Sequence, residues 1–232
     1  MADTQAIEPI SVDVVSDVMC PWCFIGKRRL EHALADIEGI DVKVTWRPFL
    51  LDPTLPPEGK DRQTYLAEKF GGKEEAEAIY ASIRQAGQDE GIAFAFEDIA
   101  RAPSTVDAHR VIRWAGVEGV QDAVVERLFS LYFLEGGDIG NHETLVAAAS
   151  EAGMDGAVVE ALLAGDADRE SVKDEIATAQ QIGVTGVPCF IVDNRYAVLG
   201  AQDPTVIADA IRQSYQERLA GIRPPAEGGP DR

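Results

Sequence analysis

The sequence predicts an α/β fold in which a long helical block interrupts a small domain that contains the strands. Three observations support this prediction. Residues 9–51 read as strand, helix and strand, residues 52–183 read almost wholly as helices, and residues 184–220 read as two strands followed by a helix. The first unit implies a parallel pair of strands, because the chain crosses over a helix between them. The two outer parts are therefore expected to form one domain around a common sheet.

Each element of the first part, residues 9–51, has its own signal in the sequence. Residues 10–16 are rich in Val and Ile, which suits a central strand. A helix is predicted from Cys23 to about Ile37, where apolar residues recur at three- and four-residue spacings, and Gly39 offers a helix end. Residues 41–51 alternate apolar and polar side chains, as a half-buried strand does.

The inserted block, residues 52–183, begins with a segment rich in Pro and Gly, after which the residue pattern changes from strand-like to helical. Helical periodicity then dominates, with Gly-rich or Asp-rich joints between the segments. The predicted helices lie at about 60–70, 73–90, 104–118, 121–135, 142–152, 155–164 and 168–182.

The last part returns to strands. Residues 186–193 and 196–199 are predicted to pair as an antiparallel hairpin around a tight turn at Asn194-Arg195. A final helix follows over about 203–219. Residues 1–8 are expected to be an extension and residues 221–232, with three prolines and three glycines, a disordered tail. The order βαβ, helical insertion, ββα is that of a thioredoxin-like fold.

The most informative motif is Cys20-Pro21-Trp22-Cys23, which follows the first strand and opens the first helix. Cysteines three residues apart in a first helical turn lie on one face, with Cα atoms about 5–6 Å apart, which a disulfide can span. Cys20 is predicted to occupy the N-cap, where unpaired N–H groups and the helix dipole stabilise a thiolate. Pro21 suits the first helical position. We therefore predict attack by Cys20 and resolution by Cys23.

The cysteine pair is also compatible with two structural roles. It could be half of a zinc site, but the chain has only one further cysteine, Cys189, and no second metal-type spacing. It could also be an inert structural disulfide, although a helix-opening pair with Pro inside is an unusual choice for one. We expect neither a bound metal nor a tightly bound cofactor.

Composition limits the classes of partner. The chain has 232 residues, 40 Asp and Glu against 21 Lys and Arg, and a net charge of −19. This balance argues against nucleic acid or an anionic membrane as the main partner. No signal peptide or membrane span is apparent, and three cysteines do not make a disulfide scaffold, so a cytoplasmic location is predicted. Lys27-Arg28-Arg29, the densest basic run, is predicted to be a solvated helix face.

Four segments together resemble the DsbA-like FrnE family of thiol oxidoreductases: residues 16–27 around the cysteine pair, 104–110, 183–188 and 200–202. They occur in matching order between residue 10 and about residue 215. The same superfamily contains kappa-class glutathione transferases and 2-hydroxychromene-2-carboxylate isomerases, in which the first cysteine is typically a serine. The resemblance implies a thioredoxin-like fold and exchange between thiols and disulfides.

The resemblance also implies roles for residues other than the two cysteines. Val187-Pro188 is expected to carry a cis bond facing the redox pair and to present a backbone edge to an extended substrate. Pro21, Trp22 and His109 are further candidates for substrate binding. Cys189 stands where the family usually has threonine, so it is either an accessory thiol or a small space-filling residue. The last candidate, Asp17, is either a proton relay for Cys23, a helix cap or a solvated side chain.

Three functions follow as hypotheses. The first is a thiol–disulfide oxidoreductase or isomerase acting on protein or small-molecule thiols, with glutathione as a candidate co-substrate and a monomer or homodimer as the working form. The second is a glutathione-dependent isomerase or transferase. Those enzymes typically have a serine where this chain has Cys20, which argues against this hypothesis. The third is a non-catalytic chaperone or redox sensor.

Overall fold

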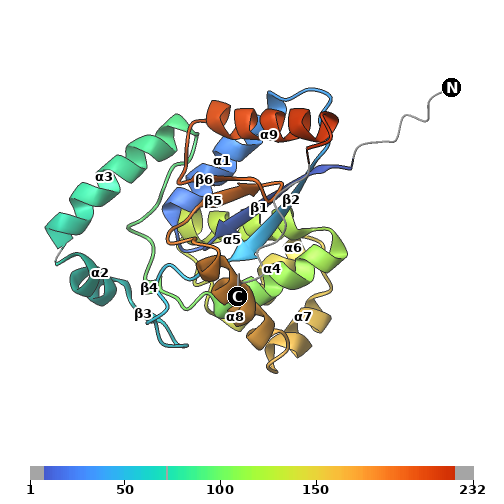
Figure 1. Cartoon of the computed structure of the whole chain (residues 1–232). Helices are drawn as coiled ribbons and strands as arrows, with labels where there is room; N and C mark the ends of the chain where they lie inside the picture. The colour runs from blue at the N-terminus through green and yellow to red at the C-terminus, as the bar shows by residue number, and fades with distance from the viewer. Residues whose placement is uncertain (1–7, 72, 223–232) are drawn as a thin grey trace.

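The computed structural model describes residues 8–71 and 73–222, with the side chains of residues 73–75 left out. Residues 1–7 and 223–232, which hold the predicted extension and most of the predicted tail, lie outside the described residues. The chain ends drawn as a grey trace in Figure 1 are these segments.

The centre of the molecule is a four-stranded sheet in the order β2-β1-β5-β6. Strands β1 (Ile10–Ser16) and β2 (Val42–Pro48) pair in parallel across helix α1 (Pro21–Ala35), which confirms the predicted crossover unit. Strand β5 (Cys189–Val192) runs antiparallel to β1, and β6 (Tyr196–Leu199) returns antiparallel to β5. The thioredoxin-like α/β fold with a helical insertion is therefore confirmed.

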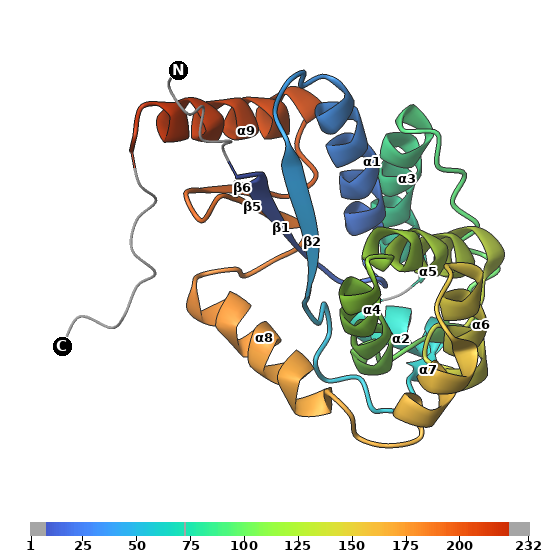
Figure 2. The same cartoon turned by 90° about the vertical axis from the view of Figure 1, so that its right-hand side faces the viewer.

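Helices cover both faces of this sheet. Helices α1 and α9 (Pro204–Leu219) pack side by side on one face of it, and α8 (Arg169–Gln181) lies on the other face (Figures 1 and 2). Successive side chains of a strand point to opposite faces. Val14 of β1 accordingly joins the main core with α1 and α9, whereas Val15 packs with Ala179 of α8 in a second cluster.

The inserted block is helical, as predicted, apart from one small feature. Its remaining helices are α2 (Arg62–Phe70), α3 (Lys73–Asp89), α4 (Val106–Glu118), α5 (Gln121–Glu135), α6 (His142–Glu151) and α7 (Gly156–Leu163). A two-residue pairing of β3 (Lys60–Asp61) with β4 (Arg101–Ala102) was not predicted, because two residues carry no periodic signal.

The block and the sheet domain share one core. Phe24 of α1 stacks on Phe129 of α5 with ring centres 5.1 Å apart, and Phe94 packs edge-on against Phe24 at 6.1 Å. Aromatic pairs of this kind add to the free energy gained by burial. The predicted domain boundaries at residues 51/52 and 183/184 remain a prediction, since a common core joins the two parts across them.

The β5–β6 turn is held by a buried carboxylate. Asp193 and Asn194 both have left-handed φ values, 53° and 52°, so the turn centres one residue earlier than predicted. The Asp193 carboxylate accepts hydrogen bonds from Ser214, Arg195 and Arg218. These donors hold its pKa below the usual range despite burial, which acts in the opposite direction.

We expect Asp193→Asn to lower the free energy of unfolding by about 2 kcal/mol at neutral pH. Asn also tolerates the left-handed turn, so the change isolates the charge. Because the folded-state pKa is lowered, the carboxylate's contribution is complete above its unfolded pKa of about 3.9 and is lost as pH falls through the folded value. Urea denaturation of both proteins at pH 7 and at about pH 3 measures this. An equal difference at the two pH values would contradict it.

Candidate active site

The cysteine pair lies at the start of α1, where β1 ends. Cys20 is the N-cap residue, with extended φ and ψ and no side-chain cap, and Pro21 is the first helical residue, so the helix begins earlier and ends earlier than predicted. The Cys20 side chain points to the Val187 carbonyl oxygen, with 3.8 Å between Sγ and O. Cys20 is 3% exposed, which leaves only a small opening to its sulfur.

Cys23 is buried, and its environment favours the protonated thiol. Burial raises the pKa of the Cys23 thiol well above its usual value, and a hydrogen bond and the charge interaction with Cys20 act in the same direction. The Asp17 carboxylate also raises this pKa, while a hydrogen bond from the Asp17 backbone lowers it. A protonated Cys23 can donate its hydrogen bond to Cys20, which stabilises negative charge on the outer sulfur.

The segment opposite the pair approaches α1 closely. The Val187–Pro188 peptide bond is cis. A Cβ atom on Gly26 would lie 2.9 Å from Cγ of Pro188 and 3.2 Å from Cζ of Phe190. This role of Gly26 was not predicted from the sequence. The sequence feature that could have revealed this role is the glycine itself. Glycine destabilises the interior of a helix, so a glycine inside the predicted helix indicates a position where close packing leaves no room for a side chain.

Gly26→Ala is expected to lower the free energy of unfolding by about 1–3 kcal/mol, because Pro188 has to move away from the added methyl group. The displaced proline also changes the segment that faces Cys20. Thermal unfolding and the rate of thiol exchange are the measurements. Gly165→Ala serves as the control, because its Cβ would meet nothing within 4 Å. A Gly26 variant as stable and as active as this control would disprove the close-packing argument.

Asp17 is neither a helix cap nor solvated, which corrects two of the interpretations offered for it. It is fully buried, and its carboxylate accepts hydrogen bonds from the backbone N–H groups of Leu51 at 2.7 Å and Met19 at 3.3 Å. Both donors come from chain segments that leave the ends of β1 and β2. The carboxylate therefore fastens these two segments together beside the cysteine pair.

His109 is almost fully buried, and its predicted role in substrate binding stays a prediction. It is 3% exposed on α4, and its Nε2 atom lies 2.9 Å from the Phe49 carbonyl oxygen and 3.6 Å from Asp17 Oδ1. A buried imidazole in this position braces the loop after β2 from the side of the helical block. We regard His109 as a positioning residue for Asp17.

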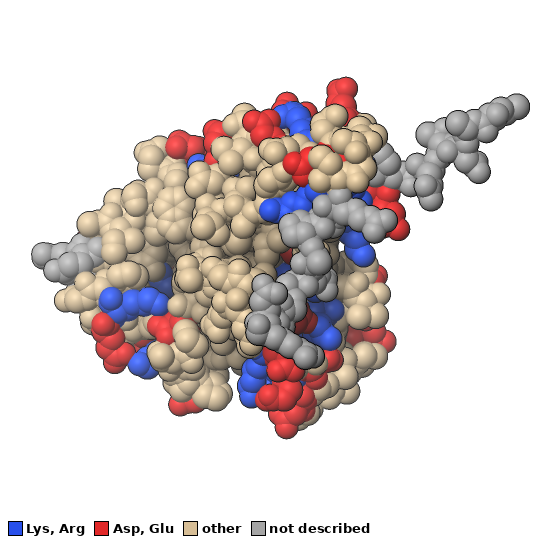
Figure 3. Space-filling view, viewed as in Figure 1, with Lys and Arg blue, Asp and Glu red and all other residues tan. Residues whose placement is uncertain are grey.

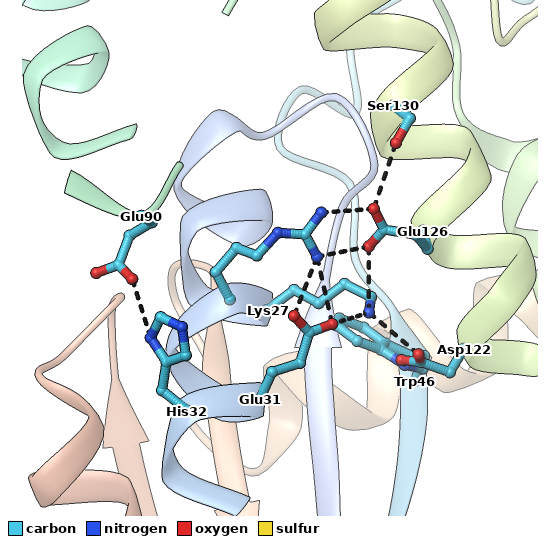
Figure 4. A network of polar contacts seen from close by, with 9 residues as sticks. Lys27, Glu31, His32, Trp46, Glu90, Asp122, Glu126 and Ser130 are labelled. Atoms are coloured by element: carbon cyan, nitrogen blue, oxygen red, sulfur yellow. Dashed lines mark hydrogen bonds and ion pairs between the residues drawn. The ribbon is translucent and has the colours of Figure 1, made fainter. Parts of the chain in front are cut away.

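The basic run of α1 is not a solvated face, as the sequence had suggested. Lys27 is 2% exposed and is surrounded by the carboxylates of Glu31, Asp122 and Glu126 (Figure 4). Asp122 also accepts a hydrogen bond from the Trp46 indole at 3.1 Å. The network joins α1, β2 and α5, so it fixes α1 against both the sheet and the helical block.

Cys189 belongs to a different buried cluster from Cys20 and Cys23, which favours the second of the two roles predicted for it. It is fully buried in the cluster on the α8 side of the sheet, with Val15 and Ala179. Its neighbour Phe190 points instead toward Gly26 of α1. Burial raises the pKa of the Cys189 thiol, which makes it less reactive. The space-filling role therefore fits the structure.

Of the residues predicted to contact substrate, Trp22 is 36% exposed and Val187 is half-buried, whereas Pro21 and Pro188 are buried. Figure 3 shows few charged side chains in the middle of the face viewed, with acidic and basic groups gathered around its edge. Within residues 8–71 and 73–222, no cluster of ligands suits a metal ion. Over the same part of the chain, no helix is long and apolar enough to cross a membrane.

Comparison with known proteins identifies the family. The model of the DSBA-like thioredoxin domain matches residues 11–212. The chain belongs to the DSBA-like thioredoxin family. A probable DsbA oxidoreductase of Streptomyces coelicolor is 33% identical, with a TM-score of 0.82 over 95% of this chain and 94% of that one. The uncharacterized protein YwbO of Bacillus subtilis (strain 168) is 28% identical over 90% of this chain and 99% of its own length.

Two more distant solved structures share the fold. The cytosolic disulfide reductase DsbM of Pseudomonas aeruginosa, solved with GSH, is 18% identical with a TM-score of 0.57, and the match covers 90% of this chain and 99% of that one. A 2-hydroxychromene-2-carboxylate isomerase is 19% identical with a TM-score of 0.64, covering 91% and 98%. At these identities the likeness concerns the fold. Both neighbours fit the resemblance found in the sequence.

Proposed function

We propose that this chain is a thiol–disulfide oxidoreductase in which Cys20 is the attacking thiol and Cys23 the resolving thiol. The observation that supports this best is the asymmetry of the pair. Cys20 sits at the helix N-cap without any other cap, while burial and Cys20 itself raise the pKa of Cys23. One sulfur is thus placed to carry negative charge and the other to keep its proton until it is needed.

The reaction balances without a cofactor. The Cys20 thiolate attacks one sulfur of a substrate disulfide, forms a mixed disulfide and expels the other sulfur as a thiolate, which takes up a proton. Cys23 then loses its proton, attacks the Cys20 sulfur and expels the second substrate thiolate. The substrate gains two electrons and two protons, and Cys20–Cys23 becomes a disulfide. The same steps in reverse oxidise a dithiol.

We propose glutathione, or a dithiol protein, as the partner that restores the starting state, and the cytoplasm as its location. The acidic balance and the family support thiol partners rather than nucleic acid. Trp22 and the Gly186–Val187 backbone, which borders Cys20, are proposed to contact the substrate. The direction of net electron flow depends on the redox potential of the Cys20/Cys23 couple relative to that partner.

The test is an equilibrium of the purified protein with mixtures of reduced and oxidised glutathione, quenched in acid and alkylated. Mass spectrometry of the peptides should show one disulfide, between Cys20 and Cys23, with Cys189 alkylated throughout. As the ratio of oxidised to reduced glutathione rises, the two free thiols should be lost together, in a single two-electron transition. A bond to Cys189, or no bond within the pair at any ratio, would overturn the proposal.

The small opening over Cys20 leads to a prediction about reagent size. Because Cys20 is 3% exposed, iodoacetamide should alkylate the native protein at least about tenfold faster than a bulky maleimide dye does, relative to each reagent's rate with free cysteine. Stopped-time alkylation with peptide mapping gives both rates. Denatured protein, where the opening no longer matters, is the control. Equal relative rates in the native state would show that the sulfur is readily accessible.

A second candidate function has one observation in its favour, the shared fold with a 2-hydroxychromene-2-carboxylate isomerase. A glutathione-dependent isomerase or transferase would use Cys20 to hold or orient a thiol and would not need Cys23. Glutathione-dependent turnover that is retained in Cys23→Ser would favour this candidate. Loss of all turnover in that variant favours the oxidoreductase.

A further inference from the structure

A cavity of about 500 Å³ lies between helices α2 and α3 and the segment 96–99. Its lining does not include the cysteine pair or the segment around Pro188. Most of the lining is apolar or aromatic, with Leu66, Tyr80, Phe96 and Ile99 among its residues. The volume falls within the range of small-molecule pockets.

The lining also contains a buried cation. Arg62, the first residue of α2, is only 7% exposed, and its backbone N–H donates to the Ala100 carbonyl. Its guanidinium Nη1 donates to the Tyr132 hydroxyl at 3.3 Å, and its Cζ lies 5.3 Å from the Tyr80 ring centre and 6.0 Å from that of Phe96. Backbone, hydroxyl and ring contacts thus hold the guanidinium at the cavity.

Where side chains are described, the contacts of the Arg62 guanidinium are the Tyr132 hydroxyl and the Tyr80 and Phe96 rings, and no ion pair joins it to a carboxylate. Arg84, which lines the same cavity, is paired with Glu97. Burying a cation without a counter-charge is costly, and a buried guanidinium is matched most effectively by an anion that accepts two parallel hydrogen bonds. The position next to a largely apolar cavity therefore indicates a ligand that supplies this anion.

We propose that the α2–α3 cavity binds a small monocarboxylate with an apolar or aromatic body, with Arg62 holding the carboxylate. The apolar lining accounts for the body of the ligand. The net charge is −19, so a multiply charged anion such as phosphate would be repelled more strongly than a monocarboxylate. This binding is independent of the thiol chemistry proposed above.

Titration calorimetry of the full chain with 4-phenylbutyrate tests the proposal, with the neutral 4-phenylbutyramide as the matched ligand. We expect one site per chain for the acid and at least about tenfold weaker binding of the amide, because the neutral amide brings no negative charge to the guanidinium and has one acceptor oxygen where the carboxylate has two. Arg62→Gln should weaken the acid's binding about tenfold or more. Arg127→Gln, which removes a guanidinium on α5 that pairs with Glu135 and does not line the cavity, should change it less than about threefold.

A second variant tests the proposal even if Arg62→Gln fails to fold. Ala67 is exposed on α2 and lines the cavity, so Ala67→Trp should fill the space without removing a buried contact and should abolish binding at an unchanged melting temperature. Equal binding of acid and amide, equal effects of the two arginine variants, or acid binding that Ala67→Trp leaves intact would each overturn the proposal. So would the absence of any binding of 4-phenylbutyrate at millimolar concentration.

Discussion

Cys20→Ser is expected to reduce the rate of thiol–disulfide exchange by on the order of a thousandfold or more, because a serine hydroxyl does not attack a disulfide at neutral pH. Cys23→Ser should behave differently. Its Cys20 can still attack, but no internal thiol then releases the substrate, so a mixed disulfide accumulates. Exchange with a fluorescently labelled disulfide peptide measures the first effect, and a non-reducing gel with mass spectrometry measures the second.

Cys189→Ala is the matched control for both variants. Cys189 is a buried cysteine on the α8 side of the sheet, so its loss should leave the activity of the folded protein within about twofold of the original. A mixed disulfide that accumulates on Cys23 in Cys20→Ser would reverse the assigned roles. Full exchange activity in both single-serine variants would exclude the pair from the chemistry. A chaperone or sensor activity that persists in the Cys20→Ser, Cys23→Ser double variant would favour the non-catalytic hypothesis.

The layout of the fold could be predicted from local patterns. The strand at residues 10–16, the crossover to a parallel strand and the final hairpin each show their own periodicity and turn residues, and these are the features that the structure confirms. The position of Cys20 at a helix N-cap was equally local, since it depends on Pro21 and on the end of one strand.

The features that were missed depend on contacts between distant segments. Lys27 looked like a solvated lysine because Asp122 and Glu126, its partners on α5, lie about a hundred residues further along the chain. Asp17 looked like a possible cap because its donor, the Leu51 N–H, belongs to the loop after β2. No periodicity reports such contacts, since they arise only when the helical block closes on the sheet.

The direction in which Cys189 points could have been anticipated. In a strand the residue after Pro188 and the next one face opposite sides. Once Phe190 is assigned to the core shared with α1, Cys189 has to lie on the α8 side, away from the pair. Closeness in sequence to Pro188 had suggested closeness in space to Cys20. Because successive side chains of a strand point to opposite faces, closeness in sequence does not imply closeness in space here.

Asp17→Asn is the second change with a large expected effect, this time on the resolving step. The Asp17 carboxylate raises the pKa of Cys23, so its removal should lower that pKa and increase the thiolate fraction of Cys23 at neutral pH. Release of the mixed disulfide should become faster, by about threefold for each unit by which the pKa falls, because a tenfold larger thiolate fraction is partly offset by lower nucleophilicity. Its pH profile should move to lower pH. The measurement is the release rate of a preformed Cys20 mixed disulfide from about pH 5 to pH 9.

Structural damage would act in a different way. Asn keeps one oxygen for the Met19 and Leu51 N–H groups, so a loss of stability of about 1–3 kcal/mol is expected, but this loss alone would not move the pH profile. Asp13→Asn is the matched control, because Asp13 pairs with Arg47 beside the same strand and is absent from the interactions that set the pKa of Cys23. A profile that stays in place, or moves to higher pH, would show that Asp17 fastens the ends of β1 and β2 without governing proton loss from Cys23.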